Sequence, residues 1–131
     1  MNRLLFESHH VRIEIDFDRC IVWFRRNAQP HASLDEAIAM FADAERATAT
    51  IDRARYGLLI DLREAIGRNE PAFEQAIAAP RAAFLSKFAR RAALVRTVAG
   101  KLQEQRLSRE SANEMAVFQD EAEAIRHLAA S

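Results

Sequence analysis

Two adjacent strand patterns near the N-terminus constrain the fold of this chain most. Apolar and polar residues alternate strictly over residues 11–17, so that every second side chain faces one side of a strand. After Asp18 and Arg19, the run over residues 20–24 is apolar at every position, which is typical of a strand covered on both faces. These patterns predict two antiparallel strands joined by a tight turn, the first at the edge of a sheet and the second inside it.

Helical and extended patterns then alternate along the chain. Ser33 and Glu36 form a capping box, which predicts a helix over residues 34–50. Pro80 predicts a kink or break near residues 76–79 of the next helix, because proline removes a backbone donor. The other predicted elements are strands over 56–62, 92–98 and 115–118, and helices from Asn69, over 101–113 and after the cap residue Asp120.

The order of these elements defines the fold class. It is strand, strand, helix, strand, helix, strand, helix, strand, helix, and helical crossovers make neighbouring strands parallel and cover both faces of a sheet. We therefore expect one α/β domain over residues 1–131, with a mixed, mainly parallel sheet of about five strands and helices on both faces.

Charge and composition exclude several classes of partner. Nineteen basic residues balance 19 acidic ones, so no overall field favours nucleic acid. No apolar run approaches the roughly 20 residues of a membrane span, and the first six residues are too short for a secretory signal, so we expect a cytoplasmic protein. With Cys20 as the only cysteine, the chain has no intramolecular disulfide.

Three segments carry a resemblance to a known family. Residues 58–62 form an apolar strand ending in Asp61-Leu62, residues 92–95 form the next core strand, and residues 117–128 form a short strand and a closing helix. They resemble the STAS superfamily, the domain of bacterial anti-sigma-factor antagonists, and its small SpoIIAA-like relatives. The resemblance implies a STAS-like fold and a non-catalytic module for regulation or protein interaction.

One departure from that family bears on regulation. The antagonists carry a phosphorylatable Ser or Thr after the strand that ends in Asp. No Ser or Thr occurs here from Ile51 to Leu85, so a phosphorylation switch of that kind has no acceptor.

The loop after Asp61 is the best candidate for a binding surface. Open α/β sheets bind ligands outside the carboxyl ends of their strands, and helix N-termini attract anions. We expect the ligand or partner surface at Arg63, Arg68, Asn69 and Glu70, with a solvated loop as the plain alternative.

A second candidate surface is aromatic. Phe73, Ile77, Phe84 and Phe88 share one face of the predicted helix, which is a core face or, at Phe84 and Phe88, an apolar interface. Together with an exposed edge strand, this face suggests a homodimer.

The remaining reactive side chains favour structural roles. Adjacent His9 and His10 point to opposite sides of a strand, and His31 and His127 lie at helix ends, so we expect no metal site. Cys20 fits a buried core thiol better than a nucleophile.

The function expected from these observations has two forms. The first is a non-catalytic interaction or regulatory module without a cofactor. The alternative is a protein that binds a small apolar or anionic ligand, because related domains are sometimes grouped with lipid-carrier folds; an enzyme comes third.

Overall fold

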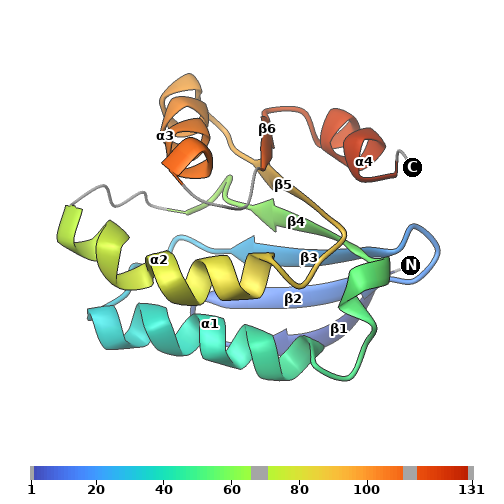
Figure 1. Cartoon of the computed structure of the whole chain (residues 1–131), viewed down its shortest axis with the longest axis horizontal. Coiled ribbons are helices and arrows are strands. Elements are labelled where there is room, and N and C mark those ends of the chain that lie inside the picture. The colour runs from blue at the N-terminus through green and yellow to red at the C-terminus, as the bar shows by residue number, and fades with distance from the viewer. Residues whose placement is uncertain (1, 66–70, 111–114, 130–131) are drawn as a thin grey trace.

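The computed structural model describes residues 2–65, 71–110 and 115–129 of the chain (Figure 1). Its strands are β1 (Asn2–Glu7), β2 (Val11–Asp16), β3 (Ile21–Arg26), β4 (Gly57–Asp61), β5 (Arg90–Leu94) and β6 (Ala116–Phe118). Its helices are α1 (Leu34–Thr48), α2 (Pro71–Leu85), α3 (Val98–Glu110) and α4 (Glu121–Ala129), with a 3₁₀ turn, η1 (Arg53–Arg55), before β4.

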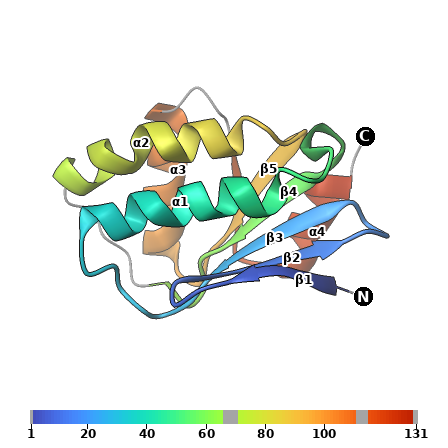
Figure 2. The same cartoon turned by 90° about the horizontal axis from the view of Figure 1, so that it is seen from below.

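The strands form one mixed sheet in which their order in space equals their order in sequence. β1, β2 and β3 pair antiparallel, and β3 to β6 pair parallel. Right-handed crossovers that step in one direction stay on one side of a sheet. Accordingly, α1, α2 and α3 lie over one face and α4 packs on the other (Figure 1 and Figure 2). The predicted α/β class, mixed sheet and helices on both faces are confirmed.

An additional strand, β1, corrects the predicted edge of the sheet. β1 pairs with β2, so residues 11–16 lie inside the sheet. The register shifts between Leu4 and Phe6, and this irregularity interrupts the period of two by which a strand is recognised in a sequence. Within the described residues, the sheet therefore has six strands.

The acidic residues of β2 also differ from expectation. The strand over residues 11–17 is predicted at the edge of the sheet, but Asp16 is 5% exposed and accepts a hydrogen bond from the backbone N–H of Arg19 at 3.1 Å. Glu14 lies 2.7 Å from Nε of Arg25 on β3. Each carboxylate is satisfied within the sheet or its turn, which allows β2 to be an interior strand.

The turn between β2 and β3 corrects the placement of Cys20. β3 begins at Ile21, and Cys20 is exposed rather than buried. Its φ of 55° lies in the left-handed region that a tight turn between twisted strands often requires. Phe17, which the alternation places on the core face, belongs to the same turn and is 48% exposed. The turn takes four residues where two were predicted.

Helices α1 and α2 cover the β2–β4 part of the sheet. The Ser33 hydroxyl accepts the N–H of Glu36 at 3.2 Å, which confirms the predicted cap of α1. α2 continues through Pro80, so of the two predicted outcomes, a kink or a break near residues 76–79, the break is wrong. Packing of the apolar face around Phe84 offsets the hydrogen bond that the proline removes.

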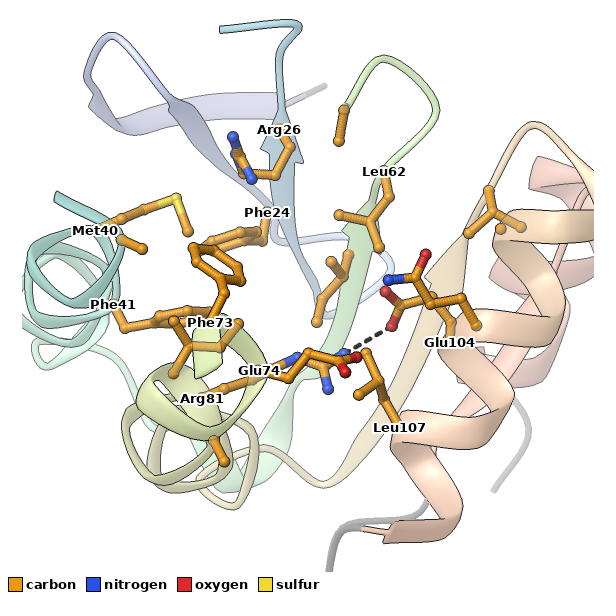
Figure 3. Close-up of a pocket in the computed structure, with 18 of the residues that line it drawn as sticks. Phe24, Arg26, Met40, Phe41, Leu62, Phe73, Glu74, Arg81, Glu104 and Leu107 are labelled. Carbon is orange, nitrogen blue, oxygen red and sulfur yellow. Dashed lines mark hydrogen bonds and ion pairs between the residues drawn. The ribbon is translucent and has the colours of Figure 1, made fainter. Parts of the chain in front are cut away.

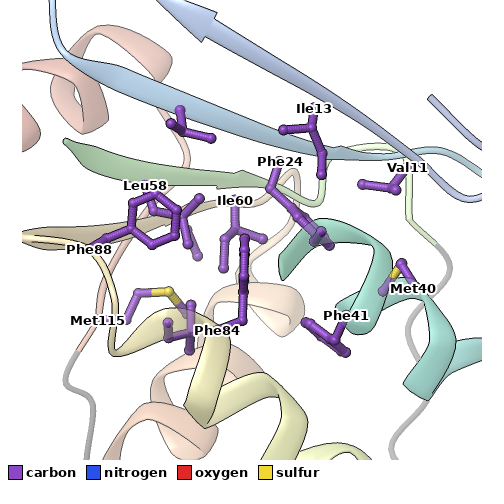
Figure 4. Packing of buried hydrophobic residues seen from close by; sticks show 14 of the residues in the cluster. Val11, Ile13, Phe24, Met40, Phe41, Leu58, Ile60, Phe84, Phe88 and Met115 are labelled. Carbon is purple, nitrogen blue, oxygen red and sulfur yellow. The ribbon is translucent and has the colours of Figure 1, made fainter. Parts of the chain in front are cut away.

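The main hydrophobic cluster lies between the sheet and these two helices (Figure 4). The ring of Phe84 lies 5.7 Å from that of Phe24, 6.4 Å from Phe41 and 5.3 Å from Phe88, measured between centroids. Phe84 is 1% exposed and Phe88 is 3% exposed. Of the two alternatives for these phenylalanines, the structure therefore places both in the core.

A smaller apolar cluster lies under α4 on the opposite face. Ala124 and Leu128 pack on the sheet there. The helix comes close because Gly57 has no side chain: a Cβ at that position would lie 3.2 Å from the Cβ of Leu128. Asp120 caps α4, as predicted, by accepting the N–H of Ala122 at 2.8 Å.

Helix α3 begins earlier than predicted. The Thr97 hydroxyl accepts the N–H of Gly100 at 3.0 Å and starts the helix at Val98, so β5 ends at Leu94 instead of continuing to residue 98. Residues 111–113, the end of the predicted helix, lie outside the described residues. No helix in the described part of the chain has the length and apolar character needed to cross a membrane.

Candidate functional site

A cleft opens at the end of the sheet where β3, β4 and β5 finish (Figure 3). Its volume is about 1040 Å³, and residues of α1, α2 and α3 border it. Ligands of open α/β sheets bind outside the carboxyl ends of the parallel strands. The cleft therefore lies at the end of the sheet that the sequence favours for recognition.

Ion pairs link the two walls of the cleft. Arg81 of α2 lies 2.8 Å from Glu104 of α3, and Arg106 of α3 lies 2.7 Å from Glu74 of α2. The side chains of Arg81 and Glu104 are 14% and 13% exposed, so this pair is largely shielded from water. Charged side chains thus join α2 to α3 across the cleft (Figure 3).

The cleft is apolar at its floor and positive at parts of its rim. Figure 3 shows Phe24, Phe41 and Leu62 around the floor and Arg26 at the rim. Such a surface suits an occupant with an apolar body and a polar or anionic end, because each part would meet a matching environment.

Arg26 at this rim is held by backbone carbonyl groups. Its Nε donates to the carbonyl of His10 at 2.9 Å, and its terminal nitrogen donates to the carbonyl of Gln29 at 3.1 Å. Within the described ranges, no carboxylate pairs with it. Burial lowers the pKa of the guanidinium, which nevertheless remains charged at neutral pH. Arg26 is therefore held in place by carbonyl groups with its positive charge available to an anion.

A network of ion pairs occupies the opposite face of the same strand ends. Asp61, the last residue of β4, accepts bonds from Nε of Arg63 at 2.9 Å and from a terminal nitrogen of Arg25 at 3.0 Å. A second nitrogen of Arg63 lies 2.9 Å from Asp61 and 3.1 Å from Glu121 on α4. Arg25 also reaches Glu14, so the network joins β2, β3, β4 and α4.

The network fixes the ionisation of its central carboxylate. Burial by itself would raise the pKa of Asp61. Hydrogen bonds from the side chain and backbone of Arg63, with the charges of Arg63 and Arg25, outweigh burial and hold this pKa below its usual value. The bond to Asp61, opposed by burial and aided by Glu121, raises the pKa of Arg63. Asp61 is therefore an anchor for two arginines and remains ionised at neutral pH.

The predicted surface residues fall into two groups. Arg63 lines the cleft, but its guanidinium is already bound to Asp61 and Glu121. Arg68, Asn69 and Glu70 lie outside the described residues. Of the four predicted residues, the structure thus places Arg63 beside the cleft, where its guanidinium pairs with carboxylates of the protein itself.

The sequence interpretation passed over two functional arginines. Arg25 and Arg26 end β3, and neighbouring residues of a strand point to opposite faces. Because adjacent residues alternate between the two faces, the sequence could have indicated that Arg25 and Arg26 face opposite sides; Arg25 joins the charge network and Arg26 faces the cleft. The partners of Arg25 could not be identified in this way, because Asp61 is 36 residues away in sequence.

Two histidines treated as independent in the sequence also meet. The rings of His10 and His31 lie 4.4 Å apart between centroids, and Glu36 lies 2.8 Å from Nε2 of His10. His31 also lines the cleft. These three residues are the group in the described part of the chain that could hold a metal ion.

Comparisons with known proteins support the fold. No family model matches the chain, and no curated protein matches it in sequence. The crystal structure of an uncharacterised DUF3478-family protein with a SpoIIAA-like fold, from Shewanella loihica PV-4, matches with a TM-score of 0.66 and 18% identity over 94% of this chain and 98% of that one. Apo-SiaC from Pseudomonas aeruginosa matches with a TM-score of 0.46 and 10% identity, over 89% and 98% of the two chains. The chain has a SpoIIAA-like fold, as the resemblance in its sequence implies.

Proposed function

We propose that this protein is a non-catalytic interaction module of the regulatory kind, working in the cytoplasm. The cleft between α2 and α3 at the carboxyl end of the sheet carries the proposal. It offers a shaped, partly apolar surface at the position where proteins of this architecture recognise other molecules. The proposed surface includes Arg63, which lines the cleft, and we extend it to Arg68, Asn69 and Glu70 because they follow β4 in the sequence.

Helix α3 gives the proposal its protein-binding character. Val98 and Leu102, one turn apart, are 63% and 61% exposed. Ala99 and Gln103 of the same helix line the cleft, so the exposed apolar pair stands next to the cleft wall. Adjacent exposed apolar side chains on a helix are a feature of protein-binding surfaces.

The interaction is expected to work without phosphorylation in this region. From Ile51 to Leu85 the chain has no Ser or Thr, so the loop after β4 and helix α2 offer no acceptor hydroxyl. The Thr97 hydroxyl at the cleft is occupied in capping α3. Recognition would therefore depend on shape and on fixed charges.

Affinity purification with matched variants tests this proposal. The wild type, a Val98→Ser/Leu102→Ser variant and a control with Leu34→Ser/Ile38→Ser on α1 are each used as bait. The control pair is 38% exposed at both positions, so it changes a comparable apolar surface elsewhere. We expect one protein to bind the wild type and the control but not the α3 variant. If both variants lost the bound protein equally, the binding surface would not lie on α3.

We also propose that the protein forms a homodimer. β1 is an edge strand with Leu4 46% exposed, and an exposed edge favours pairing with a second copy about a two-fold axis. Light scattering on a sizing column should give twice the chain mass of 14.8 kDa for the wild type. Leu4→Lys should shift the measured mass toward that of the monomer. A monomeric wild type at micromolar concentration would disprove the dimer.

A second candidate function is the binding of a small amphipathic anion. It is favoured by the apolar floor of the cleft beside the carbonyl-held guanidinium of Arg26. A long-chain fatty acid and the alcohol of the same length are suitable probes, because they share the apolar chain and differ only in the head group, which is an anion in the acid and neutral in the alcohol. Arg26→Gln should weaken binding of the fatty acid by about tenfold, equivalent to about 1.4 kcal/mol, and should leave binding of the alcohol unchanged. Arg55→Gln, at an 82% exposed side chain, is the control.

A further inference from the structure

The His10, His31 and Glu36 cluster joins two segments that are distant in sequence. His10 precedes β2, His31 precedes α1, and Glu36 lies in the first turn of α1. Each offers one nitrogen or oxygen ligand atom, and these atoms all lie within 4.8 Å of one another. The cluster therefore has the residue types and the spacing from which a cation site can be made.

The backbone around the cluster is held by specific hydrogen bonds. Arg26 donates to the carbonyl of His10 at 2.9 Å, and the N–H of His10 donates to the Ser8 hydroxyl at 3.2 Å. The Ser33 cap fixes the first turn of α1 by accepting the N–H of Glu36 at 3.2 Å. Ligands whose backbones are already in position lose little conformational entropy when an ion binds.

One ring nitrogen in the cluster lacks a partner. Nε2 of His10 lies 2.8 Å from Glu36, whereas Nδ1 of His10 is buried and has no hydrogen-bond partner within the described ranges. The side chain of His10 is 17% exposed, and His31 is 8% exposed. A buried polar atom without a protein partner is costly, and a bound ion or water is a common reason for one.

We propose that His10, His31 and Glu36 bind a divalent transition-metal ion of the zinc type. Two imidazoles and one carboxylate suit Zn²⁺, whereas Mg²⁺ and Ca²⁺ prefer sites made of oxygen alone. Bonds of about 2 Å in a tetrahedron place ligand atoms roughly 3.3 Å apart. His10 Nε2 and Glu36 lie 2.8 Å apart, so their direct bond would have to lengthen for an ion to enter, and the Glu36 side chain, 42% exposed, has room to make that adjustment.

The position of the site gives the ion an open side. Three protein ligands leave one position of a four-coordinate Zn²⁺ for water or another small molecule. His31 lines the cleft, so the ion would sit at the cleft wall close to Arg26. The metal would also tie the segment before β2 to the start of α1, which are otherwise joined here by the bond between His10 and Glu36.

Calorimetric titration of tag-free, chelator-treated protein tests the site. We expect one Zn²⁺ per chain for the wild type and no binding of Mg²⁺ under the same conditions. His10→Gln and Glu36→Gln should each lower the affinity for Zn²⁺ by about tenfold or more, since each removes one ligand. His9→Gln is the matched control, because His9 is the exposed neighbour of His10 and does not belong to the cluster.

Thermal unfolding gives an independent measurement. Zn²⁺ should raise the melting temperature of the wild type and of His9→Gln, because an ion bound to the folded state alone stabilises it. The increase should be lost in His10→Gln and Glu36→Gln, whose partly exposed positions make them better tests than the buried His31. Failure of the wild type to bind Zn²⁺, or equal weakening by His9→Gln, would overturn the proposal.

Discussion

Neighbouring residues of β3 lie in two contrasting environments on the two faces of one sheet. Phe24 is 2% exposed and contacts the rings of Phe41 and Phe84 beneath α1 and α2. Arg25 points to the opposite face, where its guanidinium lies 3.8 Å from the centroid of the Trp23 ring and pairs with Asp61. One face is closed by aromatic packing, and the other is covered at this position by charged groups.

The difference indicates separate roles for the two faces. Burial of apolar area is non-directional and provides most of the folding free energy. Partly buried ion pairs lose hydration as they gain attraction, so their net contribution is small, but their geometry is specific. We infer that the aromatic face carries stability, while the charged face sets where β4 ends and how Arg63 is held.

The largest expected effect lies on the aromatic face. Phe84→Ala should lower the free energy of unfolding by about 3–5 kcal/mol, because it leaves a cavity among three rings. Urea unfolding followed by circular dichroism measures this loss. Leu102→Ala, at a 61% exposed position, is the control and should change stability by less than about 0.5 kcal/mol. A loss below about 1 kcal/mol for Phe84→Ala would mean that the core is not organised around this ring.

A smaller loss is expected at the centre of the charged face. Asp61→Ala should cost about 1–3 kcal/mol, because Arg25 and Arg63 lose the carboxylate they share. Asp52→Ala removes an exposed ion pair with Arg55 and should cost less than about 0.5 kcal/mol. If Asp61→Ala proved as harmful as Phe84→Ala, the proposed division of roles between the faces would fail.

The pH dependence of stability should follow the same carboxylate. The pKa of Asp61 is lower in the folded protein than in the unfolded chain, where it is about 3.9. Its contribution is therefore complete above about pH 4 and is lost as the pH falls through the folded value. Between pH 7 and pH 3, the urea midpoint of Asp61→Asn should fall less than that of the wild type. An identical fall in both proteins would show that other groups cause the acid sensitivity.

Some acid sensitivity should remain in that variant. Burial alone would raise the pKa of Glu14, but hydrogen bonds and charges from Arg25 and Arg12 outweigh it and lower this pKa. Glu14 therefore also loses a stabilising ionisation at low pH, with the same sign as Asp61.

The sequence predicted best what depends on neighbouring residues. The strands predicted over residues 11–17 and 56–62 occur as residues 11–16 and 57–61, and the predicted Ser33 cap is present, because these patterns are local. The strand β1 was missed because its pairing is irregular between Leu4 and Phe6.

The site was harder to predict because its contacts are distant in sequence. Topology predicts the loop after Asp61 as a binding surface, but it could not predict the bond that holds Arg63 to Glu121, which spans 58 positions. His10 and Glu36 are separated by 26 positions, and nothing in their local patterns links them. Periodicity shows which face a side chain occupies, but it does not show which residue it meets there.

The smallest expected effect is at the rim of the charge network. Glu121 lies 3.1 Å from Arg63, but its side chain is 46% exposed, so water screens the attraction. It also stands in the first turn of α4, where a negative charge gains a few tenths of a kcal/mol from the helix dipole. Glu121→Gln should therefore reduce the free energy of unfolding by no more than about 0.5 kcal/mol. A loss equal to that of Asp61→Ala would instead show that Arg63 acts mainly as a link to α4, and that the charged face stabilises the packing of this helix rather than the end of β4.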